Sequence, residues 1–176
     1  MYKPIFFIFL LIVMAPKISK AQNSDRSILA KFTIIKGKIN NSDFSKELID
    51  AGAYTAFYTK KNNDSIYMAN VFANQNSESI GPIYNILIRQ KRQKSETAYG
   101  GVIIAFDWFY KDSYEDDQGT AKIEAIIVQG KPEGNSFSLR LLGQDNHFLE
   151  YEGKVDGIID DRLFDLFAER KNNLEN

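Results

Sequence analysis

The sequence predicts a mainly β protein: a single antiparallel barrel or sandwich of about eight strands, with one short interior helix and a C-terminal helix. Three observations lead to this prediction. After residue 52, apolar residues recur at every second position, which is the period of a half-buried strand. The strand candidates are joined mostly by connections of hairpin length, rich in Gly, Asn, Asp and Lys. No helices alternate with them, as parallel crossovers would require.

The expected elements follow in chain order. Residues 28–39, rich in Ile, Phe and Thr, form a first strand, with Gly37 as a candidate bulge. A short helix follows at residues 43–50, capped by Asn41 or Ser42 and stopped by Gly52. Further strands are expected at residues 53–59, 65–73, 82–89, 98–110, 120–129, 135–142 and 147–155. A terminal helix over residues 160–171 presents an apolar face of Leu163, Phe164, Leu166 and Phe167.

The first 21 residues differ from the rest of the chain. Lys3 precedes the 11-residue apolar run 5–15, Pro16 breaks the run, and Ser19 and Ala21 are small residues where signal peptidase cleaves. An anchor would need about 20 apolar residues to cross a membrane. We therefore expect a cleavable secretory signal over residues 1–21 and one exported domain, periplasmic or extracellular, over 22–176 with no stable membrane anchor.

Composition excludes several chemistries. The chain has no Cys, which rules out disulfides, thiolate metal sites and thiol nucleophiles, and His147 is its single His, which rules out a multi-His zinc site. It contains no Gly-x-Ser-x-Gly or Gly-x-Gly-x-x-Gly motif, so we expect no nucleotide or other cofactor. The leader holds three of the 22 basic residues and none of the 23 acidic ones, so residues 22–176 carry a net charge of −4. This charge argues against nucleic acid as a partner.

The segment 102–128 supplies the candidate binding residues. If Tyr110 lies opposite Thr120, then Trp108 faces Lys122 and Phe106 faces Glu124 on one side of a hairpin. Aromatic rings beside charged groups suit a sugar, a peptide or an aromatic ligand. The candidate ligand-binding residues are Phe106, Trp108, Tyr110, Lys122 and Glu124. The alternative is a second packed layer in which Lys122 stacks on Trp108.

The same register places Asp107 on a face of Ile, Ala and Phe. A buried carboxylate must be paired or neutralised, so Asp107 is a candidate general acid with Glu124 or Glu150 as its partner. The alternative is a strand end at which Asp107 reaches water or Arg140.

Two loops carry concentrated charge. Asp112, Glu115, Asp116 and Asp117 are weak calcium candidates, but their order does not match the helix-loop-helix calcium motif. A solvated acidic turn is the alternative. Residues 89–94 hold four basic side chains and form either a solvated connection or a surface for an anionic partner.

The strand number and terminal helix are similar in outline to lipocalin-like barrels. The Gly-x-Trp motif near the first strand of that family is missing, because the one Trp is Trp108, so no membership follows. A barrel of eight strands either encloses one small ligand or fills with side chains.

Three functions fit these observations. The first is a non-catalytic exported binding domain for a small apolar or aromatic molecule, a peptide or a glycan. The alternative is a protein-interaction or envelope-assembly module without a small-molecule pocket. A carboxylate-dependent hydrolase around Asp107 is the third.

Overall fold

The computed structural model describes residues 25–61, 63–92, 100–113, 117–130, 134–143, 148–157 and 159–172. Eight antiparallel strands form a closed barrel in the order β1-β3-β4-β5-β6-β7-β8-β9, and β1 pairs with β9 to complete it. This confirms the predicted fold class and makes it a barrel. The predicted leader lies outside the described residues.

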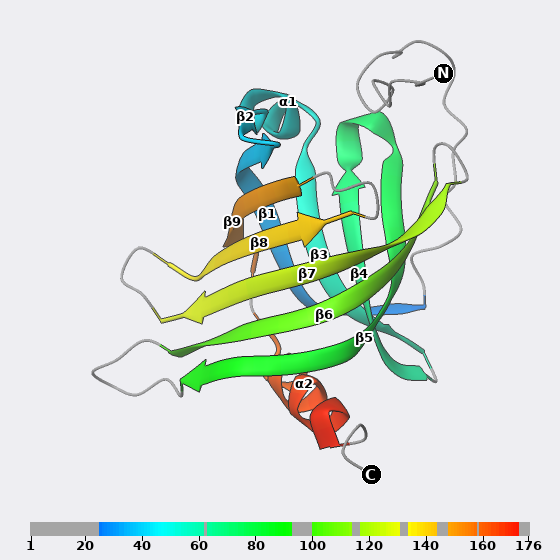
Figure 1. Cartoon of the computed structure of the whole chain (residues 1–176), viewed down its shortest axis with the longest axis vertical. Coiled ribbons are helices and arrows are strands. Elements are labelled where there is room, and N and C mark those ends of the chain that lie inside the picture. The colour runs from blue at the N-terminus through cyan, green and yellow to red at the C-terminus, as the bar shows by residue number, and fades with distance from the viewer. Residues whose placement is uncertain are drawn as a thin grey trace.

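The elements follow the chain as shown in Figure 1. They are β1 (Arg26–Ile39), β2 (Ser42–Asp43), α1 (Ser45–Asp50), β3 (Ala53–Lys60), β4 (Asn63–Phe72), the 3-10 turn η1 (Ala73–Gln75), β5 (Ser77–Arg92), β6 (Gly100–Asp112), β7 (Gln118–Gln129), β8 (Ser136–Leu142), β9 (Phe148–Val155) and α2 (Arg162–Asn172).

Aromatic side chains fill the inside of the barrel. Phe32 stacks on Phe137 with ring centroids 4.3 Å apart, and Phe57 meets both rings edge-on at 6.3 Å. Phe106 packs against Phe57 at 6.1 Å. All four rings are at most 3% exposed, so their burial and edge-to-face contacts stabilise the interior.

The helix α1 packs on the C-terminal half of β1. Its Leu48 is buried over Gly37, where a Cβ atom would overlap Leu48 Cδ1. Position 37 therefore requires a glycine, because a larger side chain would overlap Leu48 of α1. The register breaks lie between Ile28 and Ala30 and between Ile34 and Lys36, so the bulge predicted at Gly37 is wrong.

The ends of α1 agree only partly with the expected caps. Phe44 occupies the N-cap position, and Asp43 Oδ1, rather than Asn41 or Ser42, accepts a hydrogen bond from Ser45 N at 2.8 Å. The hydrogen bonds from Ser45 to Asp43 lower the pKa of that carboxyl. The helix stops before Gly52, whose φ of 63° is left-handed as predicted.

The helix α2 lies at the opposite end of the molecule from α1 (Figure 1). Asp160 precedes it, donates its backbone N–H to Leu29 O at 2.8 Å, and accepts a hydrogen bond from Arg162 N at 2.9 Å. Leu163 and Phe167 are fully buried, and the Phe167 ring meets Phe57 at 6.0 Å. The apolar face of α2 is thus part of the barrel core.

Strand β5 departs most from expectation. The sequence predicts a polar loop up to residue 81, whereas β5 begins at Ser77 and pairs with β4 from its first residue. The hydropathy of this stretch does not indicate a strand because it contains polar residues such as Ser79. In the strand the Ser79 hydroxyl donates a hydrogen bond to Asp112 Oδ2 at 2.8 Å. Asn85 has a φ of 53°, between two paired stretches of β5 and β6.

Candidate functional site

Buried side chains occupy the centre of the barrel in the described part of the chain. The four phenylalanine rings occupy its centre, Leu163 and Phe167 enter from α2, and Leu48 enters from α1. Thr55 Oγ1 donates a hydrogen bond to Asn70 Oδ1 at 2.7 Å, and Trp108 Nε1 donates one to Met68 O at 3.2 Å, so these buried polar groups have partners within the barrel. A ligand-sized internal cavity is therefore not found among the described residues.

The register of the β6–β7 hairpin differs by one residue from the predicted register. Trp108 lies opposite Ala121, Asp107 opposite Lys122 and Ala105 opposite Glu124. Because side chains alternate between the two faces of a strand, this shift reverses the face of every β7 residue relative to β6. The predicted pairs of Trp108 with Lys122 and of Phe106 with Glu124 are wrong.

The five predicted binding residues are consequently divided between two faces. Phe106 and Trp108 are buried inside the barrel, and Tyr110 is half-buried with its ring 5.1 Å from that of Trp108. Lys122 and Glu124 lie on the outer face, where Glu124 forms an ion pair with Arg89 at 3.2 Å. The structure does not bring these five side chains together in one site.

Asp107 is on the outer face and not on the apolar inner one. Its Oδ2 accepts a hydrogen bond from Asn85 Nδ2 at 2.7 Å, and Lys122 is its cross-strand neighbour. Glu150, one of the two predicted partner acids, pairs with Arg140 at 3.0 Å. These carboxylates are held by basic or amide neighbours on a solvated surface, which is a structural arrangement common on strands.

The charged loops are only partly described. Asp112 accepts a hydrogen bond from Ser79, and Asp117 Oδ1 accepts one from Gln118 N at 2.8 Å. Glu115 and Asp116 lie outside the described residues, so calcium binding stays a prediction. In the basic segment Arg89 is paired with Glu124, and residues 93 and 94 are outside the description, as is His147.

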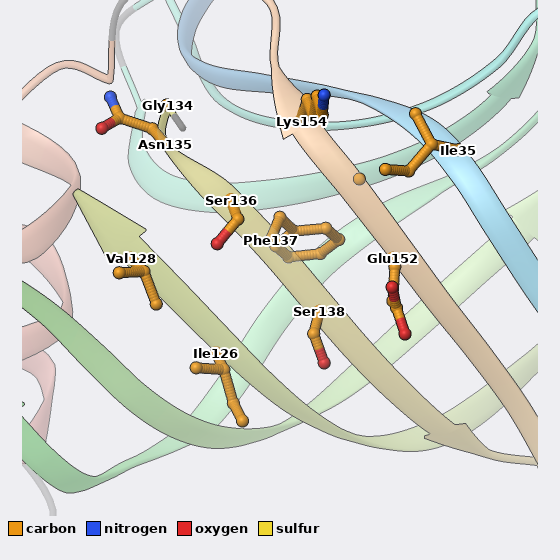
Figure 2. A pocket seen from close by; sticks show the side chains of 11 residues that line it. Ile35, Ile126, Val128, Gly134, Asn135, Ser136, Phe137, Ser138, Glu152 and Lys154 are labelled. Carbon is orange, nitrogen blue, oxygen red and sulfur yellow. The ribbon is translucent and has the colours of Figure 1, made fainter. Parts of the chain in front are cut away.

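An open groove on the outer face of the barrel is a surface feature that the sequence did not indicate. It has a volume of about 350 Å³ and extends over β7, β8, β9 and β1 (Figure 2). Ser136 and Ser138 of β8 form its floor, and Ile126 and Val128 of β7 form one wall. The other side carries four residues of β9 and β1: Glu152, Gly153, Lys154 and Ile35.

The groove arises from side-chain size. On β8 the outward positions 136 and 138 are serines, whereas their cross-strand neighbours on β7 and β9 are larger. The alternation of Ser with Phe and Leu at residues 136–139 indicates a strand with small side chains on its outer face. Only the strand register shows that the cross-strand neighbours of these serines are larger.

The charges at the groove are unequal. Glu152 forms an ion pair with Lys36 at 3.2 Å. Lys154 is exposed and forms no ion pair within the described part of the chain. Counting only the residues that the structure describes, the rim therefore carries one cation in excess.

A second surface feature is a group of tyrosines on the outer face of β3 and β4. The cations Lys31, Arg26 and Lys60 lie over the rings of Tyr54, Tyr58 and Tyr67 at 4.6, 5.2 and 4.4 Å respectively. Arg26 also forms two hydrogen bonds of 3.0 Å with Glu78. These contacts lie outside the groove and fasten the start of β1.

Comparison with protein-family models, curated proteins and solved structures finds no match to this chain. Among the described residues, no helix is both long and apolar enough to cross a membrane.

Proposed function

We propose that this chain is an exported, non-catalytic binding domain that recognises its ligand with the outside of its barrel. The observation that carries this proposal is the filled interior, in which aromatic rings and residues from both helices take the space that a ligand would need. The groove over β8 lies on the outside and is open to solvent. Export rests on the predicted leader over residues 1–21.

Native mass spectrometry tests this function. The protein is produced with its own leader, purified gently, and measured before and after denaturation. We expect a chain that begins at Gln22 and carries extra mass that denaturation releases. Ser138→Phe, which fills the groove, should abolish the extra mass, whereas Leu139→Ala, which opens space inside the barrel, should retain it. A bare chain, or mass lost only in Leu139→Ala, would contradict recognition on the outside.

A protein-interaction module without a small-molecule pocket is the second candidate. It is favoured by Tyr84, Leu87 and Phe109, large apolar side chains that are 37–50% exposed on β5 and β6. Such groups on neighbouring strands are typical of protein contacts. Replacing all three by Ser should remove crosslinked products of the exported protein. The matched change of Ile28 and Leu142, exposed apolar residues elsewhere, should leave those products unchanged.

A further inference from the structure

We infer that the groove over β8 binds an amphipathic carboxylate, a small acid with an aliphatic or aromatic body. This inference rests on the proposed function and names the ligand class for the same surface. It depends on three observations: the placement of Lys154, the apolar wall of β7, and the fully paired backbone of β8.

The donors lie at one end of the groove. Lys154 and Ser136 are direct cross-strand neighbours on β9 and β8, and both line the groove. Glu152, two residues from Lys154, is already paired with Lys36. Among the described residues, Lys154 is thus a cation without an acidic partner, and a cation near a hydroxyl donor is complementary to a single carboxylate.

The apolar wall of β7 is placed to contact the aliphatic or aromatic body of the acid. Val128 lies opposite Ser136, and Ile126 lies opposite Ser138. A carboxylate held at Lys154 and Ser136 therefore places the carbon atoms next to it against Val128 and Ile126. Ile126 is 37% exposed and is paired on its other side with Ile103 of β6, which extends the apolar surface. Covering these side chains removes apolar surface from water, which favours binding.

The backbone excludes a different mode of recognition. Strand β8 pairs along its length with β7 and with β9, so its N–H and C=O groups are used within the sheet. An extended chain cannot be added to it as a further strand. Recognition depends on side chains, and a volume of about 350 Å³ is at the small end of the range for ligand sites.

The test is an NMR titration of ¹⁵N-labelled protein, residues 22–176, with sodium octanoate. We expect shifts at the amides of Ser136, Ser138 and Lys154, and weaker binding of 1-octanol and octylamine, which share the chain length but lack the carboxylate. Lys154→Gln should weaken octanoate binding about three- to fivefold, the effect of one exposed charge pair. Lys122→Gln, a matched exposed lysine outside the groove, should leave it unchanged.

Ser138→Phe should remove the shifts, and each free variant is checked by its own spectrum. Lys154→Gln alone decides the question if Ser138→Phe fails to fold. Equal affinity for octanoate and octylamine, shifts away from β8 and β9, or unchanged affinity in Lys154→Gln would overturn the inference. If octanoate does not bind, but Ser138→Phe still removes the mass bound to the gently purified protein, the ligand class is wrong and the proposed function stands. If octanoate does not bind and Ser138→Phe has no effect on bound mass, the proposed function is wrong as well.

Discussion

At the scale of single residues, the buried hydroxyl of Tyr58 has an unfavourable environment. It is 1% exposed, and its hydroxyl has no hydrogen-bond partner within the described part of the chain. Its ring is covered by Arg26 and stacks on Tyr67 with centroids 5.4 Å apart. Desolvation is the main cause that raises the pKa of this hydroxyl, and Arg26 opposes it in part. A buried polar group without a partner reduces stability.

We expect Tyr58→Phe to stabilise the protein. The substitution keeps the ring and removes the unpartnered hydroxyl, so the free energy of unfolding should rise by about 1 kcal/mol. Denaturant unfolding measures it. Tyr54→Phe is the control, because Tyr54 is only half-buried, and should change stability by less than about 0.5 kcal/mol. A destabilised Tyr58→Phe protein would show that the hydroxyl has a partner.

Stability should fall in alkaline solution. Burial raises the pKa of Tyr151 to about 12, and burial also raises that of Tyr58. In the unfolded chain both ionise near the ordinary value of 10.0, so above that pH the unfolded state binds fewer protons than the folded state. This contribution is fully present below pH 10 and is lost as the pH rises.

Tyr151→Phe should reduce that loss by up to about 1.4 kcal/mol per pH unit above pH 10. Unfolding in denaturant between pH 8 and pH 11.5 checks this slope. Parallel curves for the wild type and the variant would contradict it.

At the scale of elements, the β6–β7 hairpin shows that a shift of one residue in register changes which side chains lie on the same face of the sheet. Both strands are recognisable from their alternation. Their relative position depends on a turn rich in acidic residues, whose geometry hydropathy does not specify. With Tyr110 opposite Gly119 instead of Thr120, Trp108 becomes a core residue and Lys122 a surface one. The aromatic and charged residues that resembled one site then belong to two faces.

Cysteine labelling can test this register, because the chain has no Cys of its own. We expect Phe109→Cys to react rapidly with a thiol reagent, because Phe109 is 41% exposed on the outer face. Ile104→Cys should react slowly, because Ile104 is fully buried. The ratio of the two rates in native buffer is the measurement, with the rates in denaturant as the reference. Faster reaction at position 104 would support the register predicted from the sequence, which places Phe109 with Asp107 on the apolar face.

Other elements were predictable to different degrees. The alternation of apolar residues at every second position predicted most of the strands and the barrel or sandwich class. The spacing of Leu163 and Phe167 predicted α2. The start of β5 was missed because Ser77, Glu78 and Ser79 have the composition of a loop, and cross-strand pairing overrides that local preference. The outer groove was missed because it depends on the size of residues on three strands at once, a property that appears only when the register is known.

At the scale of the whole molecule, α2 contributes to the core that the strands alone would leave incomplete. Its Phe167 is fully buried against Phe57, whereas Phe164 on the same helix is half-buried. This burial occupies the apolar face that would otherwise be available to a partner. The helix is therefore a structural component of the barrel.

We expect Phe167→Ala to destabilise the protein by about 3–5 kcal/mol, the cost of truncating a buried Phe. Phe164→Ala should cost clearly less because that ring is already partly in water. Thermal unfolding followed by circular dichroism compares the two. Equal losses would indicate that α2 does not insert Phe167 into the core.

The pairing of β1 with β9 has a consequence for the order of events in folding. Within the barrel, β1 has two neighbours, β3 and β9, and it pairs with β9 from Phe32 opposite Val155 to Ile39 opposite Leu149. Contacts so distant along the chain form slowly, because the loop between them must be closed first. During synthesis the barrel cannot close until β9 has left the ribosome. The polypeptide therefore stays open while all the strands between β1 and β9 are being made.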